Sequence, residues 1–78
     1  MIKVLLFAEL QERAGKSEVM VEADSISVQE LKEKYLLKYD MADLLAQAML
    51  AVNEEYSEED TVLKSGDTVA FIPPVSGG

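Results

Sequence analysis

The residue pair best suited to chemistry is Gly77-Gly78, with which the sequence closes. Neither glycine has a side chain, so this segment is the thinnest peptide that a protein could insert into a narrow channel. The α-carboxylate of Gly78 is then the distinctive functional group at the tip. The alternative is an ordinary frayed end, because chain ends often consist of small, disordered residues. A closing Gly-Gly arises by chance in about 0.5% of chains at a glycine usage of ~7%, so the pair alone is only suggestive. The residues that precede the glycines therefore have to distinguish a functional tail from a frayed end.

Those preceding residues form a strand followed by a spacer. Thr68–Ile72 is an apolar strand pattern, and Pro73-Pro74 ends it because proline has no N–H for a sheet ladder. Paired prolines also favour a semi-rigid polyproline II segment, and only Val75 and Ser76 separate them from the glycines. Six extended residues span roughly 20 Å. We therefore predict that residues 73–78 form an extended, flexible tail that reaches a buried site on another protein.

The 78-residue chain contains no cysteine and no histidine. Thiolate chemistry and zinc–thiolate sites are therefore excluded, and the usual general base near neutral pH is missing. The acidic cluster within residues 54–60 lacks the alternating Asp/Asn and glycine of a calcium loop, so we interpret it as a solvated turn. We expect a non-catalytic chain that binds no metal or cofactor itself and relies on partner proteins for catalytic groups.

The formal net charge is −8, from 15 acidic and 7 basic residues. This charge argues against nucleic-acid binding, because neutralising phosphates requires a basic surface, and it favours steering toward a basic partner. No apolar run approaches the ~20 residues of a membrane span, and the first residues do not have the layout of a signal peptide. We therefore expect no membrane association and a cytoplasmic location.

Two strands are predicted near the start of the sequence. Met1–Ala8 is largely apolar on both faces, which is typical of a central strand. Glu9–Gly15 predicts a short helical turn that ends at the glycine. Ser17–Ala23 has Val19 and Val21 on one face and Glu18, Met20 and Glu22 on the other, which favours an antiparallel partner for the first strand.

Two helices are predicted in the middle of the chain. Ser27 begins a capping box with Glu30, in which the serine hydroxyl accepts a bond from the third helical N–H and the glutamate reaches back. The apolar stripe of this main helix recurs at helical spacing: Val28, Leu31, Tyr35 and Tyr39. Asp40 is predicted to cap a second, short helix from Met41 to about Met49.

The remaining pattern completes an α+β fold. Leu50–Asn53 and Thr61–Leu63 predict short strands, and Ser65-Gly66-Asp67 predicts a turn before the last strand. The first and last strands are the most apolar, so we expect them side by side and parallel in the centre of a mixed sheet that holds one main helix. This predicts a ubiquitin-like β-grasp domain over residues 1–72, with residues 73–78 as the tail.

Three stretches of the sequence match a known pattern: Met1–Ala8, Ala51–Asn53 and Leu63–Gly78. Together they resemble the small subunit of molybdopterin synthase, a ubiquitin-like sulfur carrier. The resemblance spans essentially the whole chain, and the C-terminal block is its most specific part.

The resemblance implies a chemistry for the tail. In this family an adenylating enzyme, related to ubiquitin-activating enzymes, uses ATP to form an acyl-adenylate on the terminal glycine, which Gly78 matches. Sulfur from a donor protein then replaces AMP and leaves a thiocarboxylate. The tail, with Gly77 as its penultimate residue, inserts into the large subunit of a heterotetrameric synthase. There the sulfur passes to a cyclic pyranopterin monophosphate, and two rounds build the dithiolene of molybdopterin.

The resemblance also implies partner-binding residues. Phe7, Tyr56 and Ile72 match interface positions of the family, although many members have Leu at the position of Tyr56 and Phe-Phe before the prolines. If the first and last strands are neighbours, Phe7 and Ile72 share one outer face near the start of the tail. The alternative, from periodicity alone, is that both are ordinary core residues under loops.

Three other functions remain open. A sulfur carrier of thiamine biosynthesis has a similar fold and also ends in Gly-Gly, but usually lacks the Pro-Pro-Val-Ser segment found here. A ubiquitin-like modifier would be joined to lysines of target proteins through Gly78. A plain interaction domain with an accidental Gly-Gly end would be indifferent to removal of Gly78.

Overall fold

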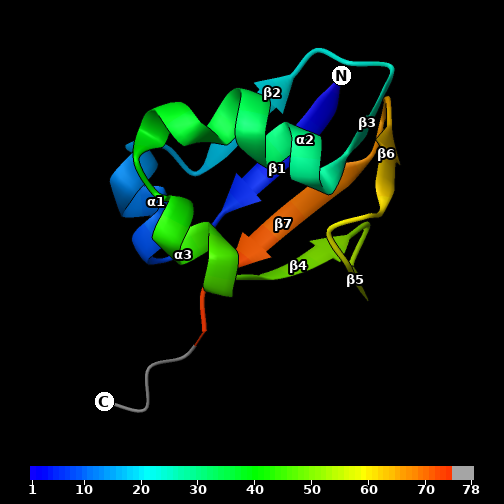
Figure 1. The fold of residues 1–78 in the computed structure, drawn as a ribbon. Helices are drawn as coiled ribbons and strands as arrows, with labels where there is room; N and C mark the ends of the chain where they lie inside the picture. The colour runs from blue at the N-terminus through cyan, green and yellow to red at the C-terminus, as the bar shows by residue number, and fades with distance from the viewer. Residues whose placement is uncertain (75–78) are drawn as a thin grey trace.

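Five strands form a mixed sheet in the order β2-β1-β7-β4-β5 (Figure 1). Their bounds are β1 (Ile2–Leu6), β2 (Glu18–Val21), β4 (Met49–Val52), β5 (Glu55–Ser57) and β7 (Thr68–Ile72). The central pair, β1 and β7, is parallel, and the other neighbours are antiparallel. The predicted pairings of the first strand with the second and the last are thus confirmed. The computed structural model describes residues 1–74.

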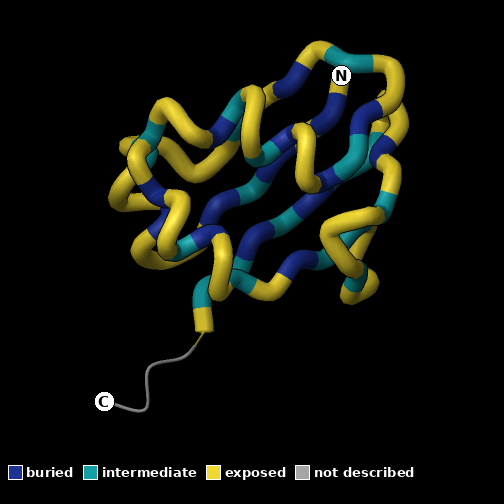
Figure 2. The backbone as a smooth tube through the Cα atoms, in the orientation of Figure 1, coloured by how far each residue is buried: buried dark blue, intermediate teal, exposed yellow. Residues whose placement is uncertain are grey.

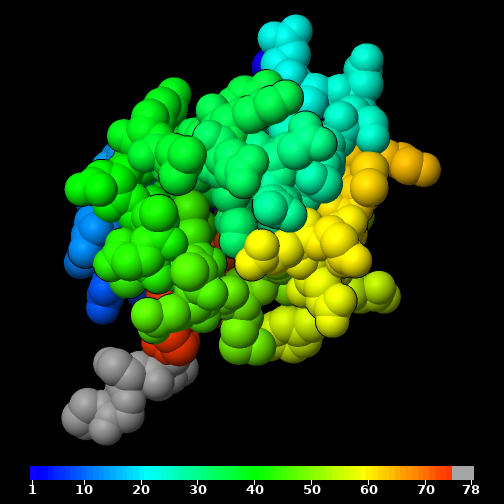
Figure 3. Space-filling model, viewed as in Figure 1, coloured from blue at the N-terminus to red at the C-terminus, as the bar shows by residue number. Residues whose placement is uncertain are grey.

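The helices cover one face of this sheet. They are α1 (Glu9–Ala14), α2 (Val28–Leu31), the π-helical η1 (Lys32–Leu36), the 3₁₀ turn η2 (Leu37–Tyr39) and α3 (Ala42–Gln47). Seen from this side, their side chains hide most of the sheet (Figure 3). Within residues 1–74, no helix is long and apolar enough to cross a membrane.

The core lies between the helices and the sheet (Figure 2). The period-2 alternation of β1 and β7 turns one set of apolar side chains toward the helices, and all of these are essentially inaccessible: Ile2, Val4, Leu6, Val69 and Phe71. The α+β arrangement, a mixed sheet with helices on one face, is the predicted one.

The start of the main helix follows half of the predicted capping box. The Ser27 hydroxyl accepts a hydrogen bond from the Glu30 backbone N–H at 3.2 Å, as expected. The Glu30 carboxylate pairs with the ammonium of Lys34, one turn later, at 3.5 Å. The side chain of Glu30 therefore supports the helix surface rather than the cap.

The predicted stripe of the main helix holds only in part in its second half, where Tyr35 and Tyr39 pack against the core without being fully buried. Val28 and Leu31 are buried, but the next fully buried residue is Leu36, five positions after Leu31, whereas Tyr35 and Tyr39 are only partly buried. The reason is η1: a π turn holds more residues than an α turn, so it rotates the following side chains around the axis.

The predicted helix cap at Asp40 is also wrong. Asp40 has left-handed backbone angles, φ 54° and ψ 49°, and ends η2. The residue that precedes α3 is Met41, which is fully buried and makes no side-chain cap bond. An aspartate tolerates the left-handed region better than most residues, so Asp40 serves as the reversal between two helices. The helix also ends earlier than predicted, because Met49 belongs to β4 and pairs with Ile72.

Two short strands were missed. β5 lies in the acidic cluster interpreted as a turn, and β3 (Ser25–Ser27) pairs with β6 (Val62–Lys64) in a separate two-stranded sheet. The β4–β5 hairpin turns at Asn53-Glu54, both with positive φ, 51° and 72°. Two such residues are the mark of a type I′ turn, whose usual signal is Asn-Gly. Because glutamate stands in place of the glycine, the pattern did not indicate a hairpin.

Candidate functional site

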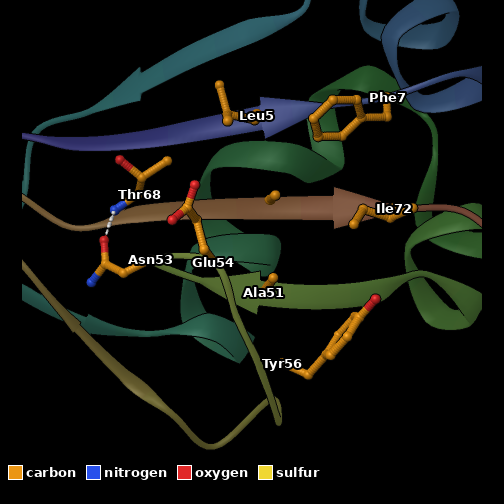
Figure 4. A pocket seen from close by; sticks show the side chains of 9 residues that line it. Leu5, Phe7, Ala51, Asn53, Glu54, Tyr56, Thr68 and Ile72 are labelled. Carbon is orange, nitrogen blue, oxygen red and sulfur yellow. Dashed lines mark hydrogen bonds between the residues drawn. The ribbon is translucent and has the colours of Figure 1, made fainter.

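The face of the sheet opposite the helices is uncovered (Figure 4). Because successive side chains alternate, the residues between the buried positions of β1 and β7 point to this side. The register then builds one row across four strands: Leu5 pairs with Ala70, Ala70 with Ala51, and Ala51 with Tyr56. Cross-strand partners share a face, so this row runs across the open surface.

The open face contains a shallow hollow of about 620 Å³. Its lining comes from the first strand, the last strand and the β4–β5 hairpin: Leu5, Phe7, Ala51, Asn53, Glu54, Tyr56, Thr68, Ala70 and Ile72. Ala51 and Ala70 have short side chains, which leave the middle of the surface low between larger neighbours. Phe7 and Ile72 lie at the same end of neighbouring strands, and Tyr56 lies on the hairpin (Figure 4).

The three residues predicted to bind a partner, Phe7, Tyr56 and Ile72, therefore line one hollow. Phe7 is 43% exposed and Tyr56 72%, and Ile72 is partly exposed. Phe7 is thus not an ordinary core residue, and Ile72 lies on the open face rather than among the fully buried side chains. Exposed apolar surface of this kind marks interaction sites, but binding by these residues stays a prediction.

The predicted tail begins beside this hollow. β7 ends at Ile72, Pro73 is partly buried and Pro74 is exposed, and the chain leaves the sheet there (Figure 1). The remaining predicted site residues, Val75, Ser76, Gly77 and Gly78, lie outside the described residues. The hollow and the start of the tail are therefore neighbours.

A hydrogen-bond network at the other end of the hollow was not predicted. The Asn53 side chain accepts a bond from the Thr68 backbone N–H at 3.0 Å and donates one to the Asp67 carboxylate at 3.1 Å. The same carboxylate accepts a bond from the Lys64 backbone N–H at 2.9 Å. These two hydrogen bonds, first that from Lys64 and then that from Asn53, lower the pKa of Asp67 below its ordinary value.

This network holds the β4–β5 hairpin against the beginning of β7. It thereby fixes where Tyr56, on the hairpin, stands relative to the hollow. Asp67 belonged to a recognisable turn signal, but nothing in the sequence pairs it with Asn53, 14 residues earlier.

The hollow is apolar at its centre and carries acidic charge at its edge. Glu54 lines it, and on the same face the Lys3 ammonium lies 4.0 Å from the Glu18 carboxylate. Across residues 1–74 there is no group of three or more acidic side chains arranged to hold a metal ion.

Comparison with known proteins shows which family this chain resembles. A model described as the ThiS family matches residues 4–78. Among curated proteins, the chain is 38% identical to the molybdopterin synthase sulfur carrier subunit of Escherichia coli, over all of both chains. It is 39% identical to the human protein of the same name, over 99% of this chain and 93% of that one.

Several solved structures have the same fold as this chain. The structure of SAMP1 from Haloferax volcanii has a TM-score of 0.84 at 25% identity and covers 99% of this chain and 98% of its own. The small archaeal modifier protein 1 of Methanosarcina acetivorans has a TM-score of 0.68 at 31% identity and covers 99% and 95%.

Proposed function

The chain belongs to the ThiS family, among the molybdopterin synthase sulfur carrier subunits, and from this membership we propose how its tail and its open face work. The function is that of a sulfur carrier in molybdenum cofactor biosynthesis. The observation that carries this conclusion is the end-to-end match to the E. coli subunit, which includes the closing Gly-Gly of this chain.

The chemistry that we propose takes place at the carboxylate of Gly78. One carboxylate oxygen attacks the α-phosphorus of ATP on an adenylating enzyme, and pyrophosphate leaves. The terminal sulfur of a persulfide on a donor protein then attacks the acyl carbon and displaces AMP. A thiol cleaves the resulting acyl disulfide by forming a disulfide with the donor cysteine, which leaves a thiocarboxylate. A carboxylate is a poor electrophile, and AMP is a good leaving group, so activation is what makes the exchange possible. A chain without cysteine or histidine needs partners for both steps.

The acceptor of the sulfur is then a cyclic pyranopterin monophosphate bound to the large subunit of the synthase. We propose that the open face docks on this subunit through Phe7, Tyr56 and Ile72, which line one hollow beside the start of the tail. Docking there directs residues 73–78 into the active site, and two rounds of transfer complete the dithiolene. The chain itself binds no cofactor in this scheme, and its need for ATP-dependent activation favours a cytoplasmic location.

Two measurements test this function. Intact-mass analysis of the protein purified from its own cells should find a fraction with one oxygen replaced by sulfur. That fraction, mixed with purified large subunit and cyclic pyranopterin monophosphate, should yield molybdopterin, whereas the carboxylate form should not. A thiocarboxylate that supports no product with the large subunit would instead favour a carrier for thiamine biosynthesis.

A second candidate function is that of a protein modifier. It is favoured by the 31% identity to a protein titled as a small archaeal modifier. Carrier and modifier share activation at Gly78 and differ in the acceptor, which for a modifier is a lysine amine. Mass spectrometry of digested cell extracts, searching for target lysines joined to the tail through Gly78, distinguishes the two.

A further inference from the structure

Two lysines from distant parts of the chain converge on one tyrosine. The Lys16 and Lys38 ammonium groups lie 5.7 Å and 5.3 Å from the centre of the Tyr39 ring. Both lysines are exposed, and Tyr39 is partly buried against the core. Both charges therefore lie near one partly fixed ring.

These two charges are not neutralised within the described chain. Among residues 1–74, no carboxylate lies within 4.0 Å of the ammonium group of Lys16 or Lys38. Arg13, by contrast, is paired: its guanidinium lies 3.9 Å from the Asp43 carboxylate and donates to the Asp40 backbone carbonyl at 2.9 Å. In a chain of net charge −8, two adjacent unpaired cations are a local exception.

This basic pair lies at the end of the sheet where the tail begins. Ser17, next to Lys16, accepts a hydrogen bond from the Leu6 backbone N–H at 2.9 Å. Leu6 in turn pairs with Phe71, just before the last residue of β7. The third lysine without a carboxylate partner among residues 1–74, Lys64, lies at the opposite end, where the neighbouring Ser65 hydroxyl accepts a bond from the N-terminal amine.

We propose that Lys16 and Lys38, with Tyr39 between them, dock an acidic segment of the synthase large subunit at the rim of the channel that receives the tail. The proposal rests on the proposed function and adds a second contact outside the hollow. Six residues can span at most roughly 20 Å, so in the proposed complex the reacting groups lie within the channel and away from the sheet. The basic pair therefore meets the protein surface around the entrance rather than the reacting groups inside.

Charge complementarity indicates which charges the partner's surface should carry. The overall acidic charge steers the chain toward basic surfaces, so a partner with uniformly acidic character would repel it. A basic surface with one acidic segment matches both the body and the basic pair, and it fixes the orientation in which the tail enters. A nucleic acid would be repelled by the remaining surface.

The test compares three variants of the full chain in binding to purified large subunit. The Lys16→Gln/Lys38→Gln double variant removes both charges, Lys16→Arg/Lys38→Arg keeps them, and Lys64→Gln is the control at the far end. We expect the Gln double variant to bind about three- to tenfold more weakly at low salt, with a smaller loss at high salt. The Arg double variant and the Lys64 control should stay within twofold of wild type.

The outcomes separate this proposal from the proposed function. Equal binding by the Gln double variant and wild type would overturn the basic pair as a docking site. A loss that Lys64→Gln reproduces, per charge removed, would also overturn it, because net charge alone would then explain the effect. If the wild-type chain itself does not bind the large subunit, the proposed function fails. Thermal melts of all variants, whose substitutions are on exposed side chains, check that the fold is retained.

Discussion

Phe71 and Ile72 are adjacent in β7 and face opposite sides of the sheet. Phe71 is fully buried among the core residues, whereas Ile72 lines the open hollow beside Phe7. The strand that carries the tail is thus anchored by one residue and presents the next to a partner. Phe71 therefore contributes to the stability of the domain, whereas the neighbouring Ile72 is available for contact with a partner.

The first prediction uses this pair of neighbours. Ile72→Ala or Phe7→Ala should weaken binding to the large subunit by ~2 kcal/mol or more, because large apolar side chains at the centre of an interface often dominate its energy. Phe71→Ala should instead lower the free energy of unfolding by ~3–5 kcal/mol, since it removes a buried aromatic side chain. Titration calorimetry and denaturant melts measure the two quantities. If Ile72→Ala destabilises the fold strongly while affinity holds, the side chain belongs to the core.

The second prediction concerns the last residue. Deleting Gly78 should abolish thiocarboxylate formation and leave the melting temperature nearly unchanged, because the residue follows the last strand by six positions and contributes no side chain to the core. Intact-mass analysis after incubation with the adenylating enzyme, ATP and a sulfur donor measures the first effect. Sulfur transfer by the truncated protein would rule out the carrier function.

The third prediction concerns Gly77. Replacing this glycine by valine adds a branched side chain where a narrow channel requires bare backbone. Gly77→Val should impair activation, transfer to the pterin, or both, with no loss of domain stability. Val75→Ala is the matched control in the tail, since it reduces bulk rather than adding it. Full turnover of the Gly77 variant in both assays would show that the channel is wide.

The fourth prediction is a pH dependence of stability. The folded-state pKa of Asp67 lies below its ordinary value of 3.8, because the carboxylate accepts hydrogen bonds from the Lys64 backbone and the Asn53 side chain. The ionised group therefore stabilises the fold at pH values above 3.8, and this contribution is lost as pH falls from there through the lower folded pKa.

The measurement is a set of denaturant melts between pH 7 and pH 2.5. Asp67→Asn should be less stable than wild type at pH 7, and the difference should shrink as the pH falls below about 4. Asp60→Asn, at an exposed residue, is the control and should show no such trend. A difference between wild type and Asp67→Asn that is constant with pH would mean that the charge of Asp67 contributes nothing.

Much of the fold follows from local patterns in the sequence. The alternation of Val69 and Phe71 with Ala70 and Ile72 indicates both the strand and its two faces, because side chains on a strand repeat every two residues. Ser27 indicates a helix start because its hydroxyl satisfies an N–H that the helix leaves unpaired. Gly77 and Gly78 stand out in the sequence by their residue type and by their place after Pro73-Pro74.

Features that depend on tertiary packing could not be predicted from local patterns in the sequence. The π turn of η1 moves burial from Tyr35 to Leu36, and the left-handed backbone at Asp40 replaces a cap. Both arise because the helices must fit over a particular sheet, and local propensity is weaker than that requirement. The β5 strand forms because β4 offers it an edge, although its own residues are acidic and polar.

The candidate site depends both on residue types, which the sequence shows, and on long-range contacts, which only the fold creates. The chain places Phe7 and Ile72 65 positions apart, and only the parallel β1–β7 pairing puts them in one hollow with Tyr56. Lys38 is next to Tyr39 in the sequence, whereas Lys16 reaches the same ring only through the tertiary structure. Residue types thus indicate what the tail can do, whereas long-range pairing sets which side chains surround its exit, because such contacts depend on the whole chain being folded.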